Sequence, residues 1–96
     1  MARRRYVITY DIPADTRRTK VHKTLTDFGD WIQYSVFLCD LNDRERVQLR
    51  ARLEPVIHRD EDQILTIDLG PADWDTDRTI ASLGRDFVLP SRVIVV

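Results

Sequence analysis

The feature that most constrains the fold of this chain is the order in which strand-like and helix-like spacings of apolar residues follow one another. Residues 5–11 and 63–69 alternate with a period of two and are rich in β-branched and aromatic residues, which predicts strands. Apolar residues three and four apart predict a helix over about 16–28 and a second helix after Asn42, ended or kinked near Pro55. Residues 31–40 are too long for one average strand, so they predict a short strand, a reversal and a second strand over 35–40.

The resulting order of strand, helix, two strands, helix and strand predicts an α+β fold of the ferredoxin-like βαββαβ type. In this two-layer sandwich, both helices cover one face of a four-stranded antiparallel sheet. The 96 residues fit a single domain, 1–96, with no room for a second one. A short helix is expected around 77–84, and an extra strand is expected where four β-branched residues follow Arg92.

Two further signals mark the ends of the predicted helices. Asp15 is expected to be the N-cap of the first helix, and Gly29 occupies the usual position of a C-terminal glycine. Asn42 and Glu45 have the spacing of a capping box at the start of the second helix.

Side chains alternate across a strand, so the pleat divides the sheet between a helix-covered face and an open face. We expect Ile8, Val36 and Leu38 to share the helix-covered face. The open face is expected to hold Val7, Thr9, Asp11, Ser35, Phe37 and Cys39. Because Val7, Phe37 and Cys39 are apolar, such a face needs a partner, which a second copy of the chain would supply.

The C-terminal strand, about 88–96, has no obvious edge to pair with in so small a sheet. It either pairs within its own chain or is exchanged onto the sheet edge of a neighbouring subunit, where it would lock a dimer. The residues alone leave both possibilities equally open.

The net charge of −1 argues by itself against a nucleic-acid partner, but the charges are unevenly distributed. Residues 1–59 contain twelve Arg or Lys and eight Asp or Glu, whereas residues 60–96 contain three and eight. Thirteen of the fifteen cations are arginines, whose forked guanidinium suits phosphate. A basic face is therefore compatible with this sequence, although an ordinary solvated surface explains the same composition.

The expected cellular location follows from the scarcity of long apolar runs and of cysteines in the sequence. No apolar run approaches the ~20 residues that cross a bilayer, and the apolar stretch 6–10 is too short for a signal peptide. We therefore expect a cytoplasmic protein with no membrane partner. The single Cys39 agrees with a reducing compartment and is interpreted as a small buried hydrophobic residue.

Several short motifs follow one another in an order and spacing typical of one family. They are residues 6–12 (YVITYDI), 15–18 (DTRR), 25–29 (LTDFG) and 32–39 (IQYSVFLC). From about residue 6 to residue 69 the chain resembles the second core CRISPR-associated protein, the small partner of the spacer integrase. The virulence-associated protein D toxins share the fold and part of this pattern. The chain departs from many members at Trp31, where they carry a basic residue.

The resemblance implies a homodimer whose terminal strand crosses to the other subunit. It implies a divalent metal site between the two copies of Asp11, holding Mg²⁺ or another cation such as Mn²⁺. The implied activity is that of an endonuclease in spacer acquisition, which hydrolyses phosphodiester bonds of RNA or DNA with Asp11 as catalytic and metal-binding residue. Tyr10, Ser35 and Phe37 are the implied neighbours of this site.

A single carboxylate is a poor site for Mg²⁺, which prefers six oxygen ligands and keeps several waters. Two copies of Asp11 facing each other across a two-fold axis supply two carboxylates and leave room for water and a substrate phosphate. A metal bound there would polarise the phosphate and ready a water for cleavage. Without the family resemblance, Asp11 is more simply explained as a strand-end residue that turns the chain toward Pro13.

A non-catalytic adaptor is the alternative function. In this hypothesis the dimer bridges copies of the CRISPR integrase, and its arginines contact the backbone of duplex DNA without reading sequence. The candidate residues are Arg17, Arg18, Arg46 and Arg50. The lack of a general base favours this hypothesis, because His22 and His58 are expected to be solvated or capping and Ser35 has no paired base.

A third hypothesis is an RNA-binding sheet of the RRM type. We rank it last, because the aromatic pairs with which such sheets stack bases are not evident at matching positions.

Overall fold

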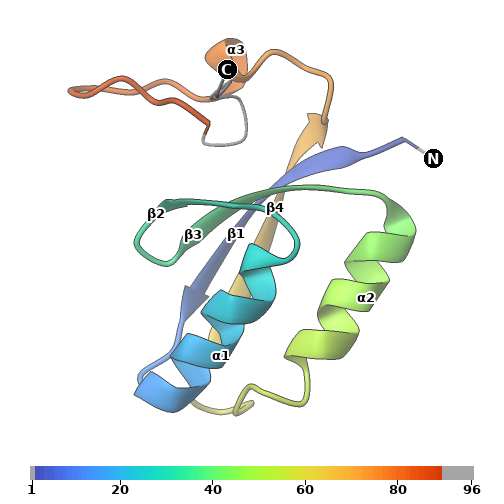
Figure 1. Cartoon of the computed structure of the whole chain (residues 1–96), viewed down its shortest axis with the longest axis vertical. Coiled ribbons are helices and arrows are strands. Elements are labelled where there is room, and N and C mark those ends of the chain that lie inside the picture. Colours follow the sequence, from blue (N-terminus) through green and yellow to red (C-terminus); the bar gives the residue numbers. More distant parts are fainter. Residues whose placement is uncertain (1, 90–96) are drawn as a thin grey trace, which may run out of the picture.

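A four-stranded antiparallel sheet forms the centre of the computed structural model, which describes residues 2–89 (Figure 1). Strand β1 (Arg4–Asp11) lies between β3 (Val36–Leu41) and β4 (Gln63–Pro71), and β2 (Asp30–Gln33) pairs with the other edge of β3. The spatial order β2–β3–β1–β4 is that of the ferredoxin-like sandwich. The predicted α+β fold is therefore confirmed.

Helices α1 (Asp15–Thr26) and α2 (Asp43–Leu53) lie side by side on one face of this sheet (Figure 1). Their apolar stripes close the core against alternate residues of β1 and β3. The core consists of Tyr6, Ile8, Tyr10, Ile12, Val21, Leu25, Phe37, Cys39, Leu41, Leu49 and Leu53. None of the helices in the described part of the chain has the length and apolar content needed to cross a bilayer.

The C-terminal part of the chain departs from the prediction. The expected helix around 77–84 is a single turn, α3 (Thr76–Thr79), followed by an irregular segment to residue 89. The strand expected at 92–96, and most of the segment 88–96 that would exchange between subunits, lie outside the described residues.

The capping box of α2 is confirmed. Asn42 Oδ1 accepts a hydrogen bond from the Glu45 backbone N–H at 2.8 Å, and the Glu45 carboxylate accepts one from the Asn42 N–H at 3.0 Å. The expected Asp15 cap is wrong, because the extended N-cap residue of α1 is Ala14. Asp15 lies in the first helical turn instead, where its carboxylate pairs with Arg18.

The expectation that Phe37 and Cys39 lie on the open face is also wrong. In the β1–β3 register Ile8 lies opposite Phe37 and Tyr6 lies opposite Cys39, and opposed residues share a face of the sheet. Phe37 and Cys39 have no exposed surface beneath the helices. Alternation within a strand shows which residues share a face but not which face is covered, and that choice depends on register.

The open face therefore holds a different set of side chains. Val7 lies between Leu38 of β3 and Ile67 of β4. Leu65 and Ile67 are 46% and 47% exposed there, whereas Leu38 is buried. This face carries a partly exposed apolar patch, formed by Val7, Leu65 and Ile67, which we call the open-face patch.

Gly29 connects α1 to the sheet for a steric reason. A Cβ atom at this position would lie 2.4 Å from Cys39 Sγ and 2.5 Å from the Leu38 carbonyl oxygen. Positive φ occurs at Gly70 and Gly84 and not at Gly29, so the close approach of two chain segments requires this glycine. The helix end packs directly against β3 as a result.

We expect Gly29→Ala to lower the free energy of unfolding by about 1–3 kcal/mol, because the added methyl group must displace backbone atoms in a packed region. Urea denaturation measures this change. The control is Thr16→Ala at an exposed position of α1, which we expect to change stability by roughly 0.5 kcal/mol or less. Equal stability of the Gly29→Ala variant and the wild type would contradict the steric role.

Candidate metal centre and nucleic-acid surface

Asp11 is the last residue of β1 and lies on the open face of the sheet. Because Tyr10 and Ile12 are buried beneath the helices, the alternation of the strand points Asp11 the other way, opposite Gln63 of β4. Its side chain is exposed, and its carboxylate forms no hydrogen bond or ion pair with any described residue. The carboxylate is therefore available to an external ligand.

The donor chemistry at Asp11 suits a hard divalent cation, since Mg²⁺ and Mn²⁺ favour carboxylate oxygens. Over residues 2–89, however, no group of three His, Cys, Asp or Glu side chains is placed to hold a metal ion. One chain supplies one carboxylate here, which is too few ligands. The residues fit the expected cation only as a site shared by two copies of the chain, with water and phosphate oxygens completing it.

The predicted neighbours of Asp11 do not all lie on its side of the sheet. The Ser35 carbonyl accepts a hydrogen bond from the Tyr10 N–H at 3.1 Å, which joins the start of β3 to the end of β1. Phe37 is buried on the helix-covered face, and Tyr10 points to that face as well. Phe37 therefore supports the strand from beneath and does not line the carboxylate's surroundings.

The Tyr10 hydroxyl lies 3.1 Å from Nδ1 of His22 on α1, and burial raises the pKa of this tyrosine. His22 is half-buried, and its ring packs edge-on against Trp31 and Phe37 with centroid distances of 5.1 Å. The expectation that His22 is solvated or capping is thus wrong. His22 ties α1 to the sheet beneath the end of β1.

The two arginines at the start of α1, Arg17 and Arg18, differ in the hydrogen bonds and ion pairs that their side chains form. Arg17 donates two hydrogen bonds, at 2.8 and 3.0 Å, to the carboxylate of Asp62, whose side chain has no exposed surface. Arg18 pairs with exposed Asp15 and donates to the Ile12 carbonyl at 3.0 Å. Arg17 therefore anchors the loop before β4, whereas Arg18 lies beside the end of β1.

Arg46 and Arg50 are exposed and one turn apart on α2. The guanidinium of Arg46 lies 4.9 Å from the centroid of the Tyr6 ring. Arg50 forms a surface ion pair with Glu54 at 2.8 Å. Exposed pairs of this kind are weak, so a phosphate can compete for Arg50.

A pocket between α1 and the β2–β3 hairpin was not visible in the sequence pattern. Its volume is about 380 Å³. Its walls include Arg18, His22 and Lys23 from α1 and Trp31, Tyr34 and Ser35 from the hairpin, and we call it the hairpin pocket. The one sequence feature that could have indicated it is the presence of aromatic residues beside a turn, where polar residues are usual.

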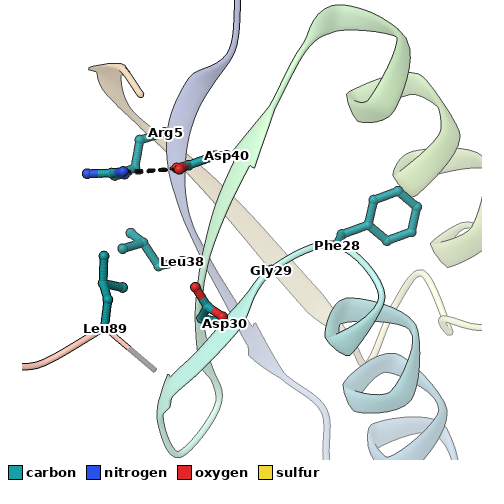
Figure 2. Close-up of a pocket in the computed structure, with 7 residues that line it drawn as sticks. All are labelled: Arg5, Phe28, Gly29, Asp30, Leu38, Asp40 and Leu89. Atoms are coloured by element: carbon teal, nitrogen blue, oxygen red, sulfur yellow. Dashed lines mark hydrogen bonds and ion pairs between the residues drawn. The ribbon is translucent and has the colours of Figure 1, made fainter. Parts of the chain in front are cut away.

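A smaller pocket, about 220 Å³, lies on the open face (Figure 2). Arg5 is buried there and donates to both oxygens of Asp40, at 2.8 and 3.0 Å, and this hydrogen bonding raises the pKa of the guanidinium. Figure 2 shows Leu89 beside Leu38, and both side chains are buried. This pocket is where the segment after α3 covers part of the sheet.

The remaining nucleophile and base candidates have structural roles. Burial raises the pKa of Cys39 to about 12, so its thiol stays protonated and unreactive. Nδ1 of His58 accepts a hydrogen bond from the Asp60 N–H at 3.2 Å, which agrees with the expected capping role.

Comparison with known protein sequences shows the family of this chain. The sequence profile described as "CRISPR associated protein Cas2" matches residues 4–77. A Rhodospirillum rubrum protein named "CRISPR-associated endoribonuclease Cas2 1" is 43% identical over 82 residues, which cover 85% of this chain and 79% of that protein. The "CRISPR-associated endoribonuclease Cas2" of Geobacter sulfurreducens is 35% identical over 92 residues, or 94% of this chain and 96% of that protein.

Solved structures agree with the sequence comparison. The crystal structure of Streptococcus pyogenes Cas2 at pH 6.5 superposes with a TM-score of 0.71 at 30% sequence identity. The match covers 83% of this chain and 99% of that one. The shared architecture is the ferredoxin-like sandwich described above.

The Arg17–Asp62 pair predicts a specific pH dependence of stability. Hydrogen bonds from Arg17 lower the pKa of Asp62 in the folded chain, so the carboxylate stabilises the fold above its unfolded pKa of about 3.9. We expect Asp62→Asn to be less stable than the wild type at neutral pH. The difference should shrink as the pH falls below about 4, which urea titrations at several pH values measure. A difference that grows on acidification would contradict the pairing.

Proposed function

The chain belongs to the CRISPR-associated Cas2 family, and from that premise we propose that it acts as a metal-dependent endonuclease in CRISPR spacer acquisition. The two relatives described above are named endoribonucleases, which favours RNA as the substrate, although a Thermus thermophilus relative is named an endonuclease. The observation that carries the proposal is Asp11, an exposed carboxylate without a partner among the described residues, at the end of the central strand.

The proposed active form is a homodimer. Its support is the open-face patch, where Leu65 and Ile67 are about half exposed although both are large aliphatic side chains. Covering this patch with a second copy removes it from water. Asp11 lies on the same face as the patch, so a two-fold axis that crosses this face near the end of β1 would bring two Asp11 carboxylates toward each other.

In this dimer the two Asp11 carboxylates would hold Mg²⁺ or Mn²⁺. When bound, the cation would supply Lewis-acid chemistry, polarising a phosphodiester toward attack by water. The negative charges of the carboxylates repel each other, which favours a cation at this position. Arg18, beside the end of β1, attracts the substrate backbone, since its ion pair with Asp15 is exposed and exchangeable. Tyr10 and Ser35 fix the strand end that carries Asp11.

The alternative function is a non-catalytic adaptor that bridges copies of the CRISPR integrase and binds the DNA backbone. The specific observation in its favour is that, within residues 2–89, no group of three His, Cys, Asp or Glu side chains is placed to hold a metal ion, so one chain does not supply a complete metal site. Arg46 and Arg50 on α2 are the candidate backbone contacts in this role, together with Arg18 and, if Asp62 releases it, Arg17.

We expect Asp11→Asn to reduce cleavage of labelled single-stranded RNA to the level seen with EDTA, because the amide lacks the charge that holds the cation. The measurement compares wild type and variant with Mg²⁺, with Mn²⁺ and with EDTA, and it includes duplex DNA as a second substrate. The matched control is Asp43→Asn, which removes an exposed carboxylate of α2. Cutting by Asp11→Asn at the wild-type rate would leave the adaptor as the better account.

The dimer proposal gives an independent prediction. We expect Ile67→Lys to shift the protein from dimer to monomer in sedimentation velocity, because the interface would bury an unpaired ammonium group. Metal-dependent cleavage should fall in parallel. Val47→Lys on α2, which also replaces an exposed aliphatic residue, should remain dimeric. A dimer that survives Ile67→Lys would mean that another surface joins the copies.

A further inference from the structure

We propose that the hairpin pocket binds one unpaired nucleotide of the substrate, with its base stacked on the aromatic side chains and its phosphate at the cationic rim. The inference rests on the proposed nucleic-acid function and deepens it, because it selects a single-stranded substrate over a duplex.

The aromatic side chains of the pocket are exposed yet fixed in place. Trp31 is 56% exposed and Tyr34 is 86% exposed. The Trp31 indole N–H donates to the Tyr34 carbonyl, and the ring makes a T-shaped contact with His22 at an interplanar angle of 83°. An indole that is held by these two contacts and is still more than half exposed loses little side-chain entropy when a base stacks on it.

Tyr34 lies in the turn between β2 and β3, in a backbone conformation that tyrosine rarely adopts. Its φ is 35°, and it is the one non-glycine residue of the described chain with positive φ. A bulky side chain in the left-handed region is strained, and a glycine would adopt this turn at lower cost. Because the Tyr34 side chain also gains almost no burial, its contribution lies in what it contacts from outside, and a nucleobase is the ligand that aromatic platforms of this kind bind.

The charges around the pocket favour an anion. Arg18 and Lys23 line it, and no carboxylate does. Lys23 is exposed and forms no ion pair with any described residue, in contrast to Arg17, which is held by two hydrogen bonds to Asp62. An ammonium group beside two aromatic rings matches the phosphate and base of one nucleotide.

The pocket lies next to the end of β1 that carries Asp11. Tyr10, which precedes Asp11, lines the pocket from the helix-covered side, and Arg18 contacts the Ile12 carbonyl on the other side of Asp11 in sequence. In this proposal, a strand with a phosphate at Asp11 passes around the end of β1 and places a neighbouring base at the pocket. Bases of a duplex are stacked and paired, so only an unpaired nucleotide reaches Trp31 and Tyr34 in this way.

The test uses the full chain and short oligonucleotides containing the fluorescent base 2-aminopurine, in EDTA so that no metal-dependent cleavage occurs. We expect single strands to bind with quenching of the 2-aminopurine, which reports stacking. Trp31→Leu should weaken single-strand binding about tenfold and abolish the quenching, while duplex binding is unchanged. Trp74→Leu is the matched control, because Trp74 has almost the same exposure, 58%, outside the pocket.

Tyr34→Gly provides a second variant, because glycine suits the positive φ at this position and the side chain is 86% exposed. We expect it to raise the stability of the chain, because glycine tolerates positive φ, and to weaken single-strand binding. If wild type binds single strands while Trp31→Leu and Tyr34→Gly bind and quench equally well, the pocket inference is overturned and the proposed function stands. If the wild type binds neither single strands nor duplex in EDTA, and neither binds nor cleaves them with Mg²⁺, the nucleic-acid function itself is overturned.

Discussion

The alternation of side chains along β1 is the constraint on which the rest of the structure depends. This strand pairs on both edges, with β3 and with β4. Its register therefore cannot shift without breaking the hydrogen bonds to both neighbouring strands. The helices α1 and α2 pack against Tyr6, Ile8 and Tyr10 of this strand, which fixes the core and the positions of both helices. The same alternation places Asp11 on the opposite face, at the end of the strand.

Two functional surfaces meet at this strand end. On the open face, Asp11 lies beyond the partly exposed aliphatic residues Leu65 and Ile67, which favours a shared site in a dimer. On the helix-covered side, Trp31 and Tyr34 leave an aromatic pocket with a cationic rim. We propose that the first surface binds the metal and that the second selects the substrate, with β1 connecting the two.

Local sequence signals predicted the order of elements, the capping box of Asn42 and Glu45, and the place of Asp11 at a strand end. They could not predict the face of Phe37, because alternation within one strand leaves the pairing register open. They also could not predict that Arg17 is held by Asp62, since 45 residues separate the two in sequence and only the fold brings them together. The hairpin pocket could not be predicted for the same reason, because Lys23 and Tyr34 belong to different elements.

If two copies of Asp11 share one divalent cation, as we propose, the stoichiometry of Mn²⁺ binding reveals it. Electron paramagnetic resonance titration of the purified chain counts bound Mn²⁺ without requiring cleavage. We expect one Mn²⁺ for every two chains, lost in Asp11→Asn. Binding of one Mn²⁺ per chain, or binding that survives Asp11→Asn, would contradict the shared site.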